Sequence, residues 1–226
     1  MNLYTVSDIR KHFIGELNDR AYTIDKTGQK TIELIGASFL ADEPAIFGTP
    51  NREYIDREID WYCSGSTNIR DIYGGDTDPP QAWQYAANEH GEINSNYGKL
   101  IFDDIYYRQY ENVVCELADS NDTTRRATMV YNRPSIWTEY QDGGKNYFIC
   151  TNAVTYYLRD NMLHAAVQMR SNDVIFGYRN DYAWQRYVQE KLQEDLYYEG
   201  MRVELGYIYW QVQNLHVYER HFDLVK

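Results

Sequence analysis

The chain has 226 residues with a formal net charge of −12, from 22 Lys and Arg against 34 Asp and Glu. This length suits one domain, over residues 1–226, with a sizeable core. The negative charge repels a phosphate backbone, which argues against polymeric nucleic acid as the main partner. The N-terminus has no apolar signal region and no stretch of about 18 apolar residues occurs, so we expect a soluble, intracellular protein without a membrane partner.

Three cysteines, Cys63, Cys115 and Cys150, are widely spaced and form no CxxC pair. This pattern is typical of a reducing compartment and predicts neither a disulfide framework nor a zinc site. The five histidines show no metal-ligand spacing, and no glycine-rich phosphate loop is present in the sequence. We therefore expect no metal at the functional site.

The N-terminal part predicts a helix followed by a strand. Ser7 is a candidate cap for a helix over 8–18, where apolar residues recur at helical spacing. The run 31–40 is strand-like, and Gly36 is a candidate bulge within it. Residues 71–80 contain several glycines and prolines, so we expect a loop there.

A second helix is expected after Asn51, with Gly65 placed to end it. Glu58 lies close to the apolar stripe of this helix, so its carboxylate either reaches solvent or enters a polar pocket. A third helix is predicted over roughly 105–118, followed by a polar loop over 119–124.

Strand-like runs dominate the second half of the chain, over 127–132, 147–158, 162–170 and 203–218. Asp160-Asn161 is expected to form the hairpin turn between the middle two runs. A helix over about 181–196 separates the last two. Helices mixed with adjacent antiparallel strands predict an α/β (α+β) domain without internal repeats.

Cys150 and Arg170 are the strongest candidates for chemistry. A cysteine attacks as the thiolate, and a nearby arginine lowers the thiol pKa. Adjacent strands would bring the two side chains together. The other candidates near them are Ser171, the pair Arg125-Arg126, and His216 with Tyr218, whose i, i+2 spacing puts them on one face of a strand. A papain-like Cys/His site would leave the arginines unexplained.

Several blocks of sequence match one family in the right order. They are DKTGQKTIELIGASFLADEPAIFG, REIDWYCSGSTNI, GEINSNYG, the pair Arg125-Arg126, FICTNAV, QMRSNDVIFGYRNDYAWQ and NLHVYERHF. Over nearly its whole length the chain resembles the thymidylate synthase superfamily, which implies a single domain with a mixed β-sheet flanked by helices. The resemblance also implies a homodimer that transfers the one-carbon unit of 5,10-methylenetetrahydrofolate to C5 of a pyrimidine nucleoside monophosphate.

Position by position, the resemblance implies three catalytic roles. Cys150 would add to C6 of the pyrimidine, which makes C5 a nucleophile. Glu58 would organise water and proton transfer, and Tyr97 would assist near the C5 proton.

The resemblance also implies the binding residues. The 5′-phosphate would be held by Lys26, Arg170 and Ser171, with Arg125 and Arg126 reaching over from the partner subunit. The sugar hydroxyl would be bound by His216 and Tyr218. The folate would be bound by Asp173, Trp83 and Gly177.

Asp181 is expected to select the base. The family's thymidylate synthases have asparagine at this position, whose amide both donates and accepts and so matches uracil. A carboxylate accepts from the N4 amino group of cytosine, whereas cytosine N3 repels it unless a proton is shared between them. Asp181 therefore favours dCMP. A shift of one residue would instead put Asn180 at this position, but the spacing of 31 residues from Cys150 favours Asp181.

A second question is whether the one-carbon unit is hydroxylated or reduced after its transfer. Ile149-Cys150-Thr151 replaces the family's Pro-Cys-His, as in the phage hydroxymethylases that supply modified cytosine for phage DNA. We therefore expect water, and not hydride, to add to the exocyclic carbon, in the cytoplasm of the host cell. The alternatives are C5-methylation of dCMP or dUMP, and a non-catalytic nucleotide-binding homologue in a nucleotide-synthesis assembly. The family's C-terminal segment, which closes over folate, is expected to be absent after Lys226.

Overall fold

A computed structural model describes residues 4–26, 28–75, 77–119 and 123–226. Within these ranges eight strands form one mixed sheet, in the order β1-β3-β8-β6-β5-β4, with β2 paired to β3 and β7 to β8. The strands are β1 (Tyr4–Thr5), β2 (Thr23–Ile24), β3 (Lys30–Leu40), β4 (Thr128–Val130), β5 (Thr151–Arg159), β6 (Met162–Met169), β7 (Asn172–Asp173) and β8 (Glu204–Tyr218). The α+β prediction and the single domain with a mixed sheet are confirmed.

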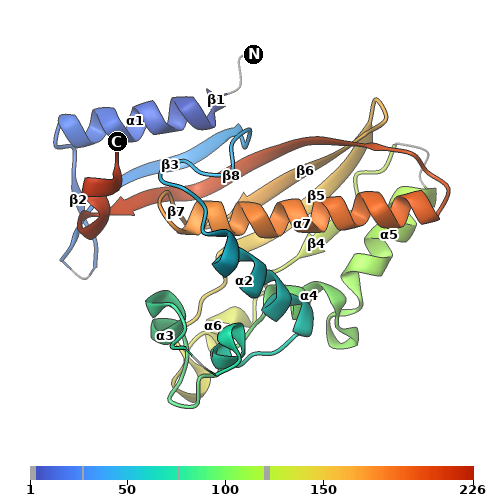
Figure 1. Cartoon of the computed structure of the whole chain (residues 1–226), viewed down its shortest axis with the longest axis horizontal. Helices are drawn as coiled ribbons and strands as arrows, with labels where there is room; N and C mark the ends of the chain where they lie inside the picture. Colours follow the sequence, from blue (N-terminus) through green and yellow to red (C-terminus); the bar gives the residue numbers. More distant parts are fainter. Residues whose placement is uncertain (1–3, 27, 76, 120–122) are drawn as a thin grey trace.

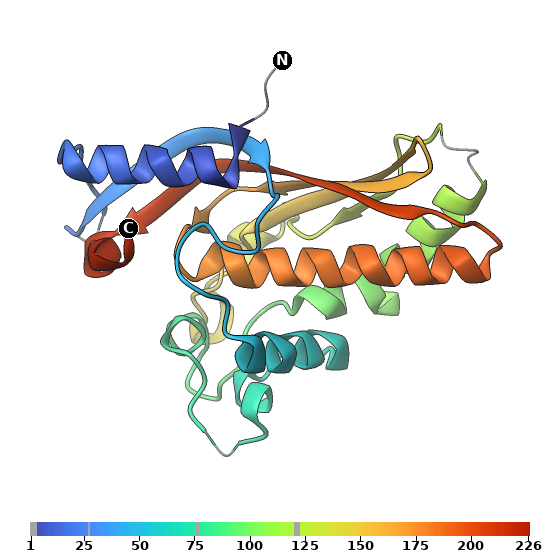
Figure 2. The ribbon, with the colours of Figure 1, turned by 45° about the horizontal axis from the view of Figure 1, so that its top comes forward.

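Helices pack against this sheet (Figures 1 and 2). They are α1 (Val6–Asn18), α2 (Arg52–Ser64), α3 (Gln81–Ala86), α4 (Tyr97–Phe102), α5 (Gln109–Asp119), α6 (Ile136–Glu139) and α7 (Gly177–Tyr198). The short 3-10 helices are η1 (Ile69–Tyr73), η2 (Asp104–Tyr106), η3 (Asp142–Gly144) and η4 (Glu219–Leu224). No helix within the described ranges is both long enough and apolar enough to cross a membrane.

The cap of α1 is Thr5, so the prediction of Ser7 is wrong. The Thr5 hydroxyl accepts a hydrogen bond from the Asp8 N–H, and the Asp8 carboxylate accepts one from the Thr5 N–H. This reciprocal capping box needs an acceptor three residues after the cap. Three residues after Ser7 stands Arg10, whose side chain only donates.

Both ends of α2 agree with the sequence. The Asn51 side chain accepts from the Tyr54 N–H at 3.2 Å, and Gly65 ends the helix with φ 69°. The third helix begins later than predicted. The chain has positive φ at Tyr107 and Arg108, which breaks the helical path before α5 begins.

Asp160 and Asn161 form the predicted turn between β5 and β6, with φ of 53° and 61°. The bulge expected at Gly36 is wrong. Ile35 pairs with Asn214 and Ala37 with Val212, so the register of β3 with β8 is the same on both sides of the glycine. The predicted loop over 119–124 falls partly outside the described residues.

Helix α7 begins at Gly177, four residues before the predicted start. The cause is Asp173, because its Oδ1 accepts hydrogen bonds from the N–H groups of Ile175, Phe176 and Gly177. These contacts satisfy donors at the beginning of the helix, as a cap does. The early start places Asp181 in the second turn of α7, facing the end of the sheet where β5 and β7 begin.

The core lies mainly between α7 and the sheet, where Trp184 of α7 and Trp210 of β8 are almost fully buried. The opposite face of the central strands is different. One row of paired residues crosses five strands there and consists of Val130, Ala153, Gln168, Gln211 and Ser38. All five are exposed or half-buried. Figure 2 shows α1 lying along β3 and α7 beneath the sheet.

Candidate active site

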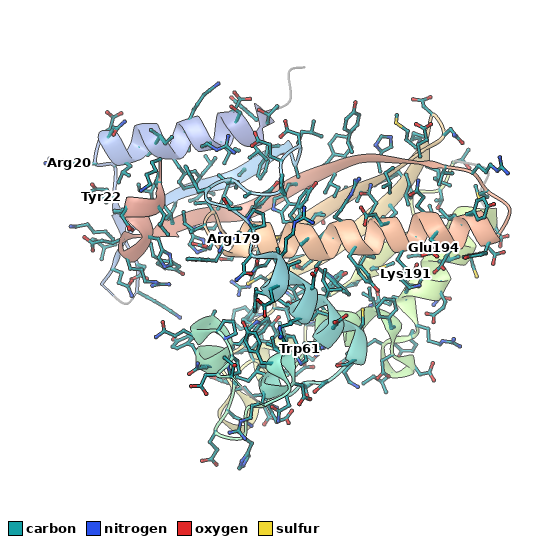
Figure 3. All side chains as sticks on the ribbon, in the orientation of Figure 1. Arg20, Tyr22, Trp61, Arg179, Lys191 and Glu194 are labelled. Atoms are coloured by element: carbon teal, nitrogen blue, oxygen red, sulfur yellow. The ribbon has the colours of Figure 1, made fainter. Side chains whose placement is uncertain are left out.

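The candidate site lies between α2 and the amino-terminal end of α7. In Figure 3, Trp61 marks the part of α2 concerned, and Arg179 marks the first turns of α7. Cys150 precedes β5 directly, and Arg170 follows β6, the strand that pairs with β5. The Arg170 N–H donates to the Cys150 carbonyl at 2.9 Å, and Arg170 Nη2 lies 3.5 Å from Cys150 Sγ. The structure therefore brings the predicted thiol and guanidinium together.

The pKa of the Cys150 thiol is raised. Burial raises it, the Arg170 charge lowers it, and the Asp181 charge raises it, with burial the largest of these effects. The predicted influence of arginine is present, but burial outweighs it. Cys150 is half-buried, and its raised pKa favours the thiol over the thiolate.

Glu58 enters a polar pocket and does not reach solvent, which is the second of the two positions predicted for it. It is 5% exposed, and its carboxyl group accepts hydrogen bonds from the Tyr54 hydroxyl and, at 3.0 Å, from Trp83 Nε1. Burial raises the pKa of Glu58, while the two hydrogen bonds lower it. A buried carboxyl group with a raised pKa is suited to exchange protons with a bound substrate.

Tyr97 connects this region to the nucleophile's strand. Its hydroxyl oxygen accepts hydrogen bonds from the Thr151 N–H at 3.3 Å and from Thr151 Oγ1 at 3.0 Å. Tyr97 is 3% exposed, and burial raises its pKa. The phenol is therefore neutral, and its position is fixed relative to the residue next to Cys150.

Asp181, and not its neighbour Asn180, makes the side-chain contact with Asn172 in the site. Asn172 Nδ2 donates to Asp181 Oδ2 at 2.8 Å, and Asn172 Oδ1 accepts from Trp210 Nε1 at 3.2 Å. The pKa of Asp181 is raised to about 8 by burial, with a further rise from the Glu58 charge. The spacing argument for Asp181 over Asn180 therefore agrees with the geometry.

Asp173, His216 and Tyr218 lie together at the end of β7 and β8. Asp173 pairs with His216 across the two parallel strands, and the rings of His216 and Tyr218 are in edge contact with centroids 4.9 Å apart. Asp173 Oδ2 is buried and, among the described residues, has no hydrogen-bond partner. An unpaired buried carboxylate oxygen is costly, and it fits a ligand that offers N–H donors, as a pterin ring does.

Four further predicted residues have these positions. Ser171 is half-buried between Arg170 and β7, and Lys26 is exposed in the turn between β2 and β3. Gly177 is the first residue of α7, and a Cβ atom there would lie 3.1 Å from Asn172 Nδ2. Trp83, predicted to bind folate, donates to Glu58 and leaves its ring half-buried.

Arg125 and Arg126 lie far from Cys150 in the same chain. The Tyr156 N–H donates to the Ala127 carbonyl at 2.8 Å, which places the arginines beside the middle of β5. At about 3.3 Å per residue, the separation from Cys150 along the strand is about 20 Å. Both side chains are exposed, and Arg126 pairs with Glu116 at 3.2 Å.

Sequence reasoning missed Asn172, Trp210 and Tyr54 as parts of the site. Tyr54 was visible as an apolar position one turn before Glu58, and that i, i+4 spacing was a usable signal. Asn172 stood between two predicted residues, but its two contacts come from separate elements, α7 and β8.

Comparison with known proteins agrees with this geometry. The thymidylate synthase family profile matches residues 16–226. The chain belongs to the thymidylate synthase family. It is 50% identical to the deoxycytidylate 5-hydroxymethyltransferase of Enterobacteria phage T4, over 98% of this chain and 89% of that protein, and equally to the phage T2 enzyme. It is 23% identical to thymidylate synthase of Francisella philomiragia, over 89% of this chain and 76% of that protein. The predicted family is thus confirmed.

Proposed function

We propose that this thymidylate synthase family member hydroxymethylates dCMP. The overall reaction converts dCMP, 5,10-methylenetetrahydrofolate and water into 5-hydroxymethyl-dCMP and tetrahydrofolate. The observation that carries the proposal is the Asp181 carboxyl group in one site with Cys150, where dUMP-specific relatives would carry an amide. The names of the phage relatives support the same substrate and product.

Cys150 forms the covalent bond to the substrate. Its thiolate adds to C6 of the cytosine ring, and the electrons that move to C5 make that carbon a nucleophile. Arg170 favours the thiolate, since its charge lowers the pKa of Cys150 against the effect of burial. In the same position the guanidinium can meet the 5′-phosphate, together with Ser171 and the exposed Lys26.

Asp181 reads the base. Cytosine offers an amino donor at N4 and an acceptor at N3, so a carboxyl group matches both only when it carries one proton. The pKa of about 8 supports a protonated Asp181 at neutral pH before the nucleotide binds. His216 and Tyr218 would bind the sugar hydroxyl from the end of β8.

Glu58 and Tyr97 handle the proton of C5 and the water molecule. The folate supplies a one-carbon unit at the oxidation level of formaldehyde, which leaves the C5 proton to be removed and a hydroxyl group to be added. The neutral phenol of Tyr97 lies beside Thr151, close to the substrate ring bound by Cys150. The raised pKa of Glu58 suits a group that takes a proton from water and returns it.

Asp173 is the residue of this chain best suited to hold the pterin. Its Oδ1 is occupied by three backbone N–H groups, while the buried Oδ2 is available for a donor of the ligand. Gly177, where a Cβ atom would lie 3.3 Å from Asp173 Cβ, and Trp83, which donates to Glu58, complete the proposed folate site.

A homodimer completes the phosphate site. The row of exposed sheet residues from Val130 to Ser38 offers a flat face for a second copy, on the side of the sheet opposite α7. Arg125 and Arg126, about 20 Å from Cys150 in their own chain by strand length, would then reach the partner's site. With three free cysteines and phage relatives, we expect the enzyme to act in the cytoplasm of the infected cell.

Tritium release tests the proposal. Protein incubated with dCMP tritiated at C5 should release tritium in the presence of methylenetetrahydrofolate, and faster than with dUMP. Release without formation of dihydrofolate distinguishes hydroxymethylation from methylation, which consumes hydride from the folate. If no tritium is released under any condition, the protein is a nucleotide-binding homologue without catalytic activity. A parallel assay with CMP determines the sugar preference.

A further inference from the structure

Asn172 is held in one orientation by two residues on separate elements. It is 3% exposed and lies between Trp210 on β8 and Asp181 on α7. The indole N–H of Trp210 only donates, so the Asn172 oxygen must face it and the amide nitrogen must face Asp181. The orientation of an asparagine amide is often ambiguous, but here the tryptophan determines it.

The consequence concerns the two oxygens of Asp181. Asn172 donates to Oδ2 at 2.8 Å, and among the described residues no other hydrogen bond to this carboxyl group is recorded. When the carboxyl group carries a proton, the oxygen that already accepts from Asn172 is better suited to remain the carbonyl oxygen. The proton then sits on Oδ1, which faces away from Asn172.

We propose that Asn172 is a positioning residue that fixes the proton of Asp181 on Oδ1, so that the carboxyl group presents one donor and one acceptor to cytosine. This inference rests on the proposed role of Asp181 in reading the base. With Oδ2 directed to the 4-position of the bound ring, Oδ1–H donates to cytosine N3 and Oδ2 accepts from the N4 amino group. Uracil needs the opposite arrangement, with the proton on Oδ2 to donate to O4, which the Asn172 donor disfavours.

Gly177 leaves the space that this arrangement needs. A Cβ atom at this position would lie 3.1 Å from Asn172 Nδ2 and 3.9 Å from Asp181 Oδ2. A larger residue would therefore push the amide away from the carboxyl group. The first residue of α7 thus serves the geometry of Asp181 as well as the start of the helix.

Several titratable groups face Asp181 and share in its behaviour. They are Glu58 and Tyr62 on α2, Tyr97 on α4, Tyr147 and Cys150 before β5, and Asp173 on β7. Burial raises the pKa of Asp181, the Glu58 charge raises it further, and the hydrogen bond from Asn172 lowers it. Removing the Asn172 donor must therefore move the pKa of Asp181 upward.

The test compares three variants. Asn172→Leu keeps the branched shape of the side chain and removes its donor, and Trp210→Phe removes the N–H that orients Asn172. Gln189→Leu is the matched control, since Gln189 is a buried amide that lies on α7 and donates to the Leu163 carbonyl at 2.7 Å. The readouts are kcat/KM for tritium release from dCMP and from dUMP, each over a range of pH.

Asn172→Leu should lower kcat/KM for dCMP roughly tenfold, as expected for one lost hydrogen bond of this strength, and should change dUMP far less. Trp210→Phe should act in the same direction with a smaller effect. Gln189→Leu should leave the ratio of the two substrates unchanged. Equal losses on dCMP and dUMP, without a shift of the pH profile, would overturn the proposal and leave Asn172 a packing residue.

A second measurement does not depend on turnover. Carbon NMR of the carboxyl groups in the nucleotide-free protein follows the titration of Asp181, whose signal is identified by its loss in Asp181→Asn. The pKa of Asp181 should rise in Asn172→Leu and stay unchanged in Gln189→Leu. An unchanged titration in Asn172→Leu contradicts the inference. If wild-type protein fails to turn over dCMP, the proposed function fails, while this titration still decides the role of Asn172.

Discussion

Arg170 is oriented by the segment before β5 that carries the nucleophile Cys150. Its Nε donates to the Ile149 carbonyl at 2.9 Å and its Nη2 to the Phe148 carbonyl, while Nη2 lies 3.5 Å from Cys150 Sγ. The guanidinium is therefore fixed beside the thiol before a substrate arrives. A phosphate bound by the same guanidinium would share its charge with the thiol.

Arg170→Leu should make Cys150 less reactive. The Arg170 charge lowers the pKa of Cys150, so its removal raises that pKa and leaves less thiolate at a given pH. Alkylation of Cys150 by iodoacetamide, followed by mass spectrometry of its peptide, should be several-fold slower at neutral pH. Cys115 is exposed and serves as the internal control. An unchanged alkylation rate at Cys150 would contradict this role.

Cys150→Ala should abolish tritium release from dCMP, because no other group then adds to C6. The matched variant Cys115→Ala changes an exposed thiol on α5, outside the site, and should retain wild-type turnover. Persistent release in Cys150→Ala would show that another group activates the ring.

Asp181→Asn should shift preference from dCMP toward dUMP. An amide turned so that its nitrogen donates to O4 and its oxygen accepts from N3–H matches uracil, and in this orientation it mismatches cytosine at both positions. A base contact of this kind is worth roughly 1 to 3 kcal/mol, so the ratio of kcat/KM values should change by roughly 5- to 150-fold. Asn180→Asp is the control for register, and it should leave the ratio near its wild-type value. An equal ratio in wild type and Asp181→Asn refutes the role of Asp181.

The stability of the protein should depend on pH through Asp181. The folded pKa of about 8 is above that of an unfolded aspartate, so the contribution of this group is fully present at low pH and declines as pH rises to about 8. The variant Asp181→Asn has no titrating carboxyl group at this position. The free energy of unfolding of the variant, relative to wild type, should therefore be larger at pH 9 than at pH 5 in urea titrations. A difference that is independent of pH would show that Asp181 is not desolvated.

Complementation tests whether two chains share each site. The double variant Arg125→Ala, Arg126→Ala and the variant Cys150→Ala should each be nearly inactive alone. After unfolding and refolding together, half of the dimers are mixed and carry one intact site of two, so activity should return to about a quarter of wild type. Recovery requires that the arginines serve the partner's cysteine. If mixed dimers form but activity does not return, the arginines and the cysteine serve the same chain.

The sequence predicted those parts of the site that depend on local patterns. The strand-like runs that became β5 and β6 and the turn at Asp160 were readable, and they bring Cys150 next to Arg170. Asn51 and Gly65 marked both ends of α2 and so placed Glu58. Individual roles came from the family resemblance, because spacing alone gives each of these residues a plausible structural function.

Contacts between distant elements were not predictable in the same way. The start of α7 depends on the Asp173 side chain, which acts as a cap from outside the helix. The role of Asn172 depends on Trp210, which follows it by 38 positions and reaches it only through the pairing of β7 with β8. The raised pKa of Cys150 likewise follows from its burial, which residue spacing does not reveal.

The most direct test of hydroxymethylation is the origin of the product's new oxygen atom. The protein is incubated with dCMP and methylenetetrahydrofolate in water enriched in oxygen-18, and the nucleotide is analysed by mass spectrometry. We predict 5-hydroxymethyl-dCMP whose hydroxyl group carries the heavy oxygen, with tetrahydrofolate as the second product. A methylated nucleotide accompanied by dihydrofolate, or unchanged dCMP, would contradict the proposed reaction.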